Sequence, residues 1–281
     1  MRFPGRRAPA RASYLWRMTN RASKELFDLS SRVALVTGGG THLGKAFAES
    51  LSELGATVYI ASRRSEVCEE TANELSARGL KVHSETVDAR DEASVHSLVE
   101  RIVEKSGTLD IAVANAGGHQ TRSHPPHGKI SEFIAAFEMN TLATYITAQE
   151  AAKVMIPKKR GAIITLGSIA AQLAMDPRTY NKEFLRSGAP YISAKAGVLN
   201  LTRALAAEFG PHGVTVNCIS PGQIPNDETN KEMVEKFRNM NALHRTGLAE
   251  DVKGAVALLA SDAGKWITGQ EIRVDGGWSI W

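Results

Sequence analysis

The sequence predicts an α/β protein that folds as one doubly wound domain around a seven-stranded parallel sheet. Short apolar runs alternate with longer amphipathic stretches from Arg32 onward, which is the pattern of right-handed βαβ units. The runs are apolar at almost every position, as in strands that helices cover on both faces. No break in composition divides the 281 residues, and α/β folds of about 250 residues commonly form one domain.

The elements follow one another in a regular order. The apolar run at 33–37 predicts the first strand. Apolar residues at steps of four, four and three between Leu43 and Leu54 predict a helix, which Gly55 ends. The same reasoning predicts helices at 65–78, 91–106, 130–156, 191–210 and 249–261, and strands at 58–61, 81–87, 110–114, 162–166, 214–219 and 271–274.

Three stretches interrupt the alternation. Residues 117–129 are rich in His, Pro and Gly, 172–189 are polar, and 222–247 are polar with a short helical pattern. Open α/β sheets bind their ligands beyond the carboxyl ends of the strands. We therefore expect substrate loops near 172–189 and 222–247.

The positive charge is concentrated at the N-terminus. The net charge is +4, but residues 1–24 hold seven basic residues and no acid, so the rest of the chain is mildly acidic. This distribution argues against a nucleic-acid-binding body. We expect 1–25 to be a basic, disordered leader, or sequence upstream of a start at Met18, and 26–281 to be the catalytic domain. An organelle-targeting peptide is the alternative reading of the leader.

Cysteine and histidine placement limits the chemistry further. Cys68 and Cys218 are the two cysteines and lie far apart, which excludes a disulfide scaffold and a Cys-rich zinc site. Cys218 is expected to be a small buried residue, and Cys68, on a polar helix, to be unreactive. His119, His124 and His127 share a proline-interrupted stretch without nearby acids, which predicts a loop and no metal site. No run approaches the ~18 apolar residues of a membrane span.

A glycine-rich turn joins the first strand to the first helix. Glycines let the backbone turn tightly and approach a pyrophosphate, whose charge a helix N-terminus stabilises. A purely structural turn is the alternative, but the strand–turn–helix context favours a dinucleotide site. The expected cofactor-binding residues of this turn are Gly38, Gly40, Thr41, His42, Leu43 and Gly44.

The end of the second strand bears on the choice of cofactor. An acid there would bind the ribose 2′-hydroxyl of NAD(H), whereas arginine suits the 2′-phosphate of NADP(H). The sequence has Arg63 and Arg64 after Ser62, and no acid. Guanidinium groups match phosphate geometry, so we expect NADP(H) to be preferred, with NAD(H) possible. Two solvated surface arginines are the alternative.

Tyr191 and Lys195 are four residues apart at the start of a predicted helix, directly after Pro190. This spacing places both on one helical face, where an ammonium would lower the pKa of the phenol toward working pH. The spacing by itself is common, so the surrounding motifs have to support it.

The chain resembles the short-chain dehydrogenase/reductase family over roughly residues 26–281, because a series of short motifs matches in order. The matching segments are Thr37-Gly38 to Gly44, Asp88, Asn115-Ala116-Gly117, Asn140, Ser168, Tyr191 with Lys195, Pro221-Gly222 and Asp275-Gly276-Gly277. The resemblance implies a Rossmann-like domain and hydride transfer between a nicotinamide cofactor and a carbonyl or alcohol. By the same resemblance, the protein would be a homotetramer or homodimer.

The resemblance also implies a catalytic set. Tyr191 would be the general acid in reduction and the base in oxidation, and Lys195 would lower its pKa and bind the nicotinamide ribose. Ser168 would stabilise developing alkoxide charge on the substrate oxygen, and Asn140 would position a water of a proton relay. The further cofactor-binding residues would be Asp88 and Ala89 at the adenine, Asn115, Ala116 and Gly117 beside the fourth strand, and Pro221, Gly222 and Ile224 at the nicotinamide.

Three positions depart from the family pattern. His42 stands where the glycine motif usually has Gly, which predicts an altered phosphate turn. Ala114 replaces the first Asn of the usual Asn-Asn-Ala-Gly, and Asn226 replaces a usual Thr. None of these changes removes a group needed for hydride transfer.

The interval between Ser168 and Tyr191 is longer than is common in the family and contains several charged residues. It resembles members that act on sugar acids and polyols, such as gluconate dehydrogenase-like enzymes. It predicts a polar lid in which Arg178 pairs with a substrate carboxylate. A structural insertion is the alternative.

The sequence thus predicts a cytoplasmic NADP(H)-preferring oxidoreductase whose partner is a small carbonyl or alcohol substrate. A sugar acid or polyol is the first substrate class considered. A reductase of 3-oxoacyl-thioesters or apolar ketones is the alternative within the same chemistry. A cofactor-sensing interaction protein without catalysis is the alternative of another class. We expect neither nucleic acid nor membrane among its partners.

Overall fold

A computed structural model describes residues 21–118, 124–176, 178, 180, 187–227 and 229–281. The leader predicted for residues 1–25 lies mostly outside these ranges. Its last residues are described: Ser23–Leu26 form a short helix, α1, and Arg21 makes an ion pair of 2.5 Å with Asp262. Arg21 and the first three residues of α1 are exposed, and none of α1 is buried.

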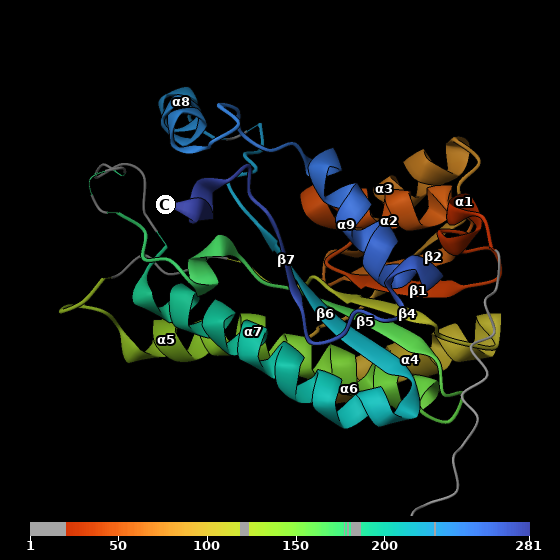
Figure 1. Ribbon diagram of the computed structural model, residues 1–281. Helices are drawn as coiled ribbons and strands as arrows, with labels where there is room; N and C mark the ends of the chain where they lie inside the picture. The colour runs from red at the N-terminus through yellow and green to blue at the C-terminus, as the bar shows by residue number, and fades with distance from the viewer. Residues whose placement is uncertain (1–20, 119–123, 177, 179, 181–186, 228) are drawn as a thin grey trace, which may run out of the picture.

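Seven parallel strands form a single sheet in the order β3-β2-β1-β4-β5-β6-β7 (Figure 1). This order confirms the doubly wound α/β fold that the sequence predicts. The strands are β1 (Val33–Thr37), β2 (Thr57–Ser62), β3 (Val82–Thr86), β4 (Ile111–Ala114), β5 (Gly161–Leu166), β6 (Val214–Pro221) and β7 (Glu271–Val274).

The interior strand β1 is buried along its whole length. Successive side chains of a strand point to opposite faces of the sheet, so Ala34 and Val36 join one core and Val33 and Leu35 the other. Helices bury both faces of the sheet at this strand. The sequence of β1 is therefore apolar from Val33 to Val36 and does not alternate between apolar and polar residues.

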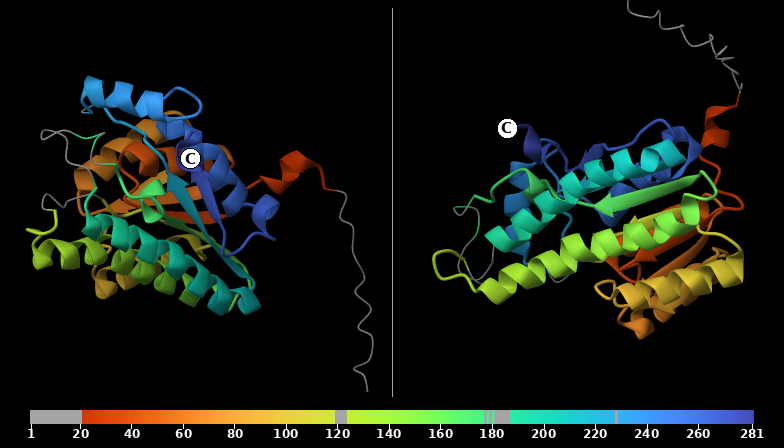
Figure 2. Two further views of the ribbon diagram at one scale, coloured as in Figure 1. Left: turned by 60° about the vertical axis from the view of Figure 1, so that its left-hand side comes forward. Right: turned by 90° about the horizontal axis from the view of Figure 1, so that it is seen from below.

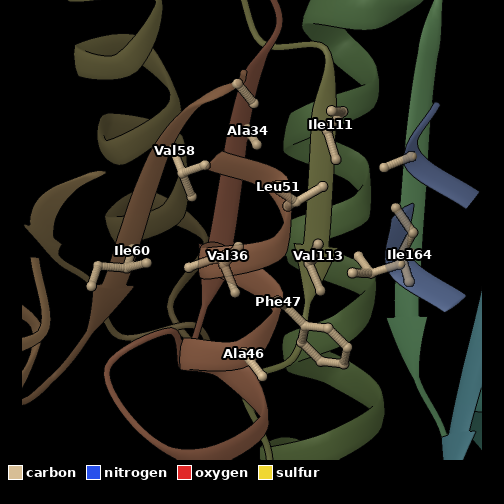
Figure 3. Close-up of a cluster of buried hydrophobic side chains, with 14 of the residues drawn as sticks. Ala34, Val36, Ala46, Phe47, Leu51, Val58, Ile60, Ile111, Val113 and Ile164 are labelled. Carbon is tan, nitrogen blue, oxygen red and sulfur yellow. The ribbon is translucent and has the colours of Figure 1, made fainter. Parts of the chain in front are cut away.

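Helices cover the two faces of the sheet (Figure 2). The helices α2, α3 and α9 pack on the face of Ala34 and Val36, and α4, α6 and α7 pack on the opposite face. In Figure 3, Phe47 and Leu51 of α2 lie against side chains of β1 and β4. The helices are α2 (His42–Glu53), α3 (Ser65–Ala77), α4 (Glu92–Ser106), α5 (Ile130–Phe137), α6 (Ala143–Met155), α7 (Ala189–Phe209), α8 (Lys231–Met240) and α9 (Lys253–Ala260).

Two predicted helices differ in detail. The helix expected at 130–156 is interrupted by a π-helical turn at Glu138–Leu142 between α5 and α6. The helix expected at 249–261 begins as a 3-10 turn, Ala249–Val252, before α9. The short helical pattern within 222–247 is α8, which lies beyond the carboxyl ends of the strands (Figure 1). Among the described residues, no helix is long and apolar enough to cross a membrane.

Candidate active site

A cleft of about 390 Å³ opens where β1, β4, β5 and β6 end. Parallel strands bring their carboxyl ends to one edge, so segments far apart in sequence meet there. The lining residues are Gly38, Gly40, Thr41, His42, Leu43, Gly44, Ser62, Arg64, Val67, Asn115, Ala116, Gly117, Gly118, Leu166, Gly167, Ser168, Tyr191, Lys195, Pro221 and Gly222.

The two ends of the glycine turn, Gly38 and Gly44, approach each other so closely that neither position has room for a side chain. Gly38 has φ = 67°, which glycine adopts without strain. A Cβ on Gly44 would lie 2.0 Å from the Gly38 carbonyl oxygen. The N-terminus of α2 follows directly, and its first turn carries no acid. The turn therefore offers backbone N–H groups at the mouth of the cleft, as a site for a pyrophosphate requires.

Asn115 holds this turn from the neighbouring strand. Its side-chain Nδ2 donates to the carbonyl oxygens of Thr37 (3.0 Å) and Gly38 (2.9 Å). The Ala116 N–H donates to the Thr37 hydroxyl over 3.2 Å. The turn is thus bonded to β4 although Ala114 replaces the usual asparagine.

His42 adopts φ = 46° at the position where the family usually has glycine. A left-handed conformation is uncommon for a residue with a Cβ, although His is among the side chains that tolerate it best. The altered residue therefore keeps a glycine-like backbone and adds an exposed imidazole to the cleft wall.

A second cavity of about 310 Å³ continues from the first and shares Gly38, Ser62 and Arg64 with it. Its wall includes Arg63 and Asp88, together with Ala89 and Arg90. Arg90 donates to both Asp88 carboxylate oxygens, from Nε over 3.0 Å and from Nη2 over 2.7 Å.

These bonds to Arg90 lower the pKa of Asp88 to about 2. Sequence reasoning missed Arg90, since it follows no motif. Arg90 lines the same cavity as Arg63 and Arg64 because β3, which precedes it in the sequence, pairs with β2.

Cys68 is fully buried on α3, so the polar setting expected for it was wrong. Its thiol lies 3.3 Å from the Ser62 hydroxyl, behind the glycine turn, and a Cβ on Gly40 would come within 3.1 Å of the sulfur. Burial raises the pKa of the Cys68 thiol, which keeps it protonated and unreactive.

Tyr191 and Ser168 meet at the inner end of the cleft. Ser168 caps the 3-10 turn Ile169–Ala171 by accepting the Ala170 N–H at 3.1 Å. Burial raises the pKa of Tyr191, and hydrogen bonding with the Ser168 side chain lowers it by a smaller amount. The net shift is opposite to the lowering that the nearby lysine was expected to cause, because the buried phenolate loses its hydration.

Lys195 is 4% exposed, and its Nζ lies 5.8 Å from the centroid of the Tyr191 ring. The ammonium donates to the Leu166 carbonyl oxygen over 2.8 Å. Burial lowers the pKa of Lys195 to about 8. The lysine is therefore held beneath the cleft by the end of β5, and its charge can change near neutral pH.

Asn140 lies in the π-helical turn, buried behind the cleft wall. Its Oδ1 accepts the Gly118 N–H, and its Nδ2 donates to the carbonyl oxygens of Gly118 (3.2 Å) and Ala136 (2.9 Å). A Cβ on Gly117 would lie 2.8 Å from Asn140 Oδ1 and 3.6 Å from Lys195 Nζ. Glycine at 117 thus lets asparagine and lysine approach the same point.

The predicted nicotinamide residues are divided between two cavities. Pro221 and Gly222 line the cleft, and Asp275 backs Gly222, where a Cβ would lie 2.6 Å from the Asp275 Cα. Ile224 instead lines a separate pocket. The Asn226 carboxamide accepts a hydrogen bond from the Thr229 hydroxyl at 2.9 Å.

The structure brings the predicted residues together with two exceptions. Ile224 and Asn140 do not line the cleft or its continuation, although Asn140 lies directly behind Gly117 and Gly118. Sequence reasoning missed Leu166, whose contribution is a backbone carbonyl that no residue type reveals. It also missed Gly118, which follows the recognised motif by one residue.

Only part of the predicted lid 172–189 is described, and the two charged side chains within that part, Asp176 and Arg178, pair with each other. Arg178 is 91% exposed and makes an ion pair of 2.6 Å with Asp176. That pairing lowers the pKa of Asp176 to about 2. Of the three histidines considered for a metal, His119 lies outside the described residues. Within the described ranges no group of three His, Cys, Asp or Glu could bind a metal ion.

The residues of the cleft fit an elongated dinucleotide. Glycines at positions 38, 44 and 117 line the cleft without adding Cβ atoms. Arginine side chains line the second cavity, which is the far cavity of the site. At the near end a hydroxyl pair, Ser168 and Tyr191, faces the cleft above a buried lysine. This arrangement can bind a carbonyl oxygen and give it a proton.

Comparisons with known proteins agree with this geometry. A family model described as "Enoyl-(Acyl carrier protein) reductase" matches residues 40–279. Xanthoxin dehydrogenase of Arabidopsis thaliana is 32% identical, over 89% of this chain and 90% of the relative. Gluconate 5-dehydrogenase of Gluconobacter oxydans is 30% identical, over 91% and 98%. A solved gluconate 5-dehydrogenase of Burkholderia cenocepacia, in complex with NADP and tartrate, superposes with a TM-score of 0.84 at 26% identity, over 92% and 100%.

Proposed function

The chain belongs to the short-chain dehydrogenase/reductase family, and from that membership we propose that it interconverts a ketone and a secondary alcohol with NADP(H). As a member it is an NAD(P)-dependent oxidoreductase acting on alcohol or carbonyl groups, and not a catalytically silent interaction protein. The choice of cofactor, the roles of single residues and the substrate are the proposed part.

One observation carries the proposal. Tyr191 and Ser168 line the same end of the cleft that begins with the glycine turn, and Lys195 Nζ lies 5.8 Å from the centroid of the Tyr191 ring. In reduction Tyr191 would give its proton to the substrate oxygen, and Ser168 would donate a hydrogen bond to that oxygen. Lys195 would stabilise the resulting phenolate. A bound nicotinamide would supply or accept the hydride.

Three guanidinium groups support a preference for NADP(H). Arg63, Arg64 and Arg90 line the far cavity, and the residues directly after β2 are Arg63 and Arg64 and not an acid. Asp88 neutralises Arg90, so Arg63 and Arg64 would bind the 2′-phosphate. A charged hydrogen bond is worth about 1.5–3 kcal/mol, equivalent to roughly tenfold or more in affinity.

Calorimetric titration tests the cofactor choice. We expect NADPH to bind more than tenfold more tightly than NADH, and Arg63→Ala or Arg64→Ala to reduce that ratio. Equal affinities in the unmodified protein would refute the preference. A substrate screen that follows the absorbance of reduced cofactor, run with both cofactors, tests turnover itself.

A sugar acid or polyol, the first class considered from the sequence, has support from the gluconate 5-dehydrogenase relatives. The arginine expected to bind its carboxylate is, however, paired with Asp176 and exposed. An apolar ketone, the alternative, would need no such arginine.

We propose that the chain assembles with copies of itself. Apolar side chains stand exposed along α5 and α6, with Ile130 75% and Ile134 53% exposed. A second copy bound here would bury this stripe, since large exposed apolar patches commonly mark protein–protein interfaces. Sedimentation of the purified protein tests the assembly.

The proposed compartment is the cytoplasm, and imaging of the tagged full chain would reveal import into an organelle.

A further inference from the structure

A short turn after β3 lies beside the arginines that follow β2. The two strands pair up to their last residues, and the Val87 N–H continues the pairing by donating to the Ser62 carbonyl oxygen over 3.1 Å. The Asp91 N–H then donates to the Asp88 carbonyl oxygen over 3.0 Å, which closes the turn directly before α4. The turn therefore meets the far cavity with a fixed backbone.

Within this turn, Arg90 binds both oxygens of the Asp88 carboxylate. Its backbone N–H and its Nε donate to Oδ1 over 3.1 and 3.0 Å, and its Nη2 donates to Oδ2 over 2.7 Å. The pKa of Asp88 is lowered to about 2, first by the hydrogen bonds from Arg90 and more weakly by the charges of Arg90 and Arg63. Asp88 thus interacts with two guanidinium groups, of which Arg90 holds it by hydrogen bonds.

Arg63 and Arg64 are left available to a ligand. Both are exposed, and both line the far cavity. In the part of the chain that the structure describes, neither guanidinium group forms an ion pair with an acid. Because the charge of Arg63 already acts on Asp88, Arg63 is the group that this carboxylate would turn to if Arg90 were absent.

Arg90 itself is surrounded by acids. Hydrogen bonding to Asp88 is the main cause that raises the pKa of Arg90, and the charge of Glu138, at the start of the π-helical turn, adds to it. Its Nε and Nη2 atoms are both used on Asp88. Arg90 is therefore less available to a phosphate than Arg63 and Arg64 are.

A carboxylate released at this point would oppose a bound 2′-phosphate in two ways. It would repel the phosphate, and it would compete for Arg63. We infer that Arg90 is a positioning residue for cofactor choice, which holds the Asp88 carboxylate so that Arg63 can bind the 2′-phosphate of NADP(H). This inference rests on the proposed function. The ribose 2′-hydroxyl of NAD(H) carries no charge, so NADH should depend little on Arg90.

Calorimetric titration of each variant with NADPH and with NADH tests the inference. The ratio of the two affinities cancels any loss that both cofactors share, such as a disturbed adenine contact. We expect Arg90→Ala to lower the NADPH-to-NADH affinity ratio about five- to tenfold, mainly through weaker NADPH binding. A ratio that stays unchanged in Arg90→Ala would overturn the inference.

Asp88→Asn separates an action through Asp88 from a direct contact of Arg90 with the phosphate. Asp88→Asn removes the charge that Arg90 holds, so by itself it should keep the affinity ratio or raise it. Added to Asp88→Asn, Arg90→Ala should change the ratio less than about twofold. A lower ratio in Asp88→Asn alone, or a full five- to tenfold loss from Arg90→Ala in both backgrounds, would overturn the inference.

Salt supplies a readout that a purely structural role would not move. The Debye length falls to about 3 Å at ~1 M salt, so the difference in ratio between the parent and Arg90→Ala should shrink to less than about twofold. A difference of equal size at low and high salt would show that Arg90 shapes the turn and does not act through charge.

Arg178→Ala is the matched control. Arg178 binds Asp176 in the same way, with Nε on Oδ1 over 3.0 Å and Nη2 on Oδ2 over 2.6 Å, but neither residue lines the cleft or the far cavity. Its replacement should leave the affinity ratio unchanged, and an equal fall would overturn the inference. A ratio near one in the parent would refute the proposed preference for NADP(H), whereas a high parent ratio that survives Arg90→Ala refutes the inference alone.

Discussion

The cofactor end and the substrate end of the site are built in different ways. The cofactor end uses backbone atoms of three short segments near 37–44, 62–64 and 115–118, held by glycine contacts and the amide of Asn115. The substrate end, around Tyr191, packs on side chains of four segments between 169 and 278. Backbone contacts tolerate almost no change in residue, whereas packed apolar side chains tolerate substitutions of similar volume. Mutations at the two ends should therefore differ in kind.

Tyr191 lies where the two ends meet, and its replacement should have the largest effect. Tyr191→Phe keeps the ring that packs on the apolar side chains of the substrate end and removes the transferable proton. We expect turnover to fall by about 10²- to 10⁴-fold while NADPH affinity is unchanged, in steady-state kinetics with a parallel titration. Near-normal turnover would assign the proton to another group.

Lys195 should reveal the energetic cost of burying a charge beside Tyr191. Its pKa is lowered to about 8 by burial, so the unfolded chain binds the extra proton between pH 8 and pH 10.5. Burying the charged lysine therefore lowers the free energy of unfolding, and this loss is largest below pH 8. The loss disappears as the pH rises from 8 to 10.5, because the unfolded chain then also gives up the proton. Lys195→Met should raise the free energy of unfolding of the cofactor-free protein at pH 7, by up to about 3 kcal/mol.

Denaturant titrations at pH 7 and pH 10.5 check this prediction, and the difference between variant and parent should shrink at the higher pH. The gain at pH 7 is partly offset because the Leu166 carbonyl loses its donor. A variant that is less stable than the parent at pH 7 would show that the charged lysine is well solvated in the fold.

Gly44→Ala probes the backbone of the turn. The added Cβ would meet the Gly38 carbonyl at 2.0 Å, so the turn must open. Overpacking of this kind costs about 1–3 kcal/mol, which we expect to appear as roughly ten- to a hundredfold weaker NADPH binding. Gly254→Ala is the control, since it lies on α9 with open space around it. It should leave binding unchanged and slightly raise the Tm.

Arg178→Ala should have the smallest effect. The guanidinium is 91% exposed and bonded to Asp176, and exposed ion pairs contribute little. We expect kcat/KM to change less than about twofold on an acidic ketone and on its uncharged analogue. A selective loss of tenfold or more on the acidic ketone would restore the carboxylate-binding lid that the sequence suggested.

Local patterns were enough to predict the layered fold and many of the residues that line the cleft and its continuation. Strand and helix periods differ, so the alternation of β1, α2 and their successors was readable from residues near one another. The glycine turn was readable because its function needs consecutive residues of one kind. The π-helical turn at Glu138–Leu142 was not, since its sequence is compatible with a continuous α-helix and the contact of Asn140 with Gly118 is made across the fold.

The tertiary structure alone decided how Tyr191 is surrounded. The spacing to Lys195 suggested a lowered tyrosine pKa, yet burial raises it, and burial depends on segments up to Trp278 that no local pattern connects. The polar composition of 172–189 suggested a polar lid, yet Asp176 and Arg178 bond to each other while Met175 is buried. A sequence fixes which groups are present along the chain. Which of them lose water, and which find a partner, depends on how distant segments pack together.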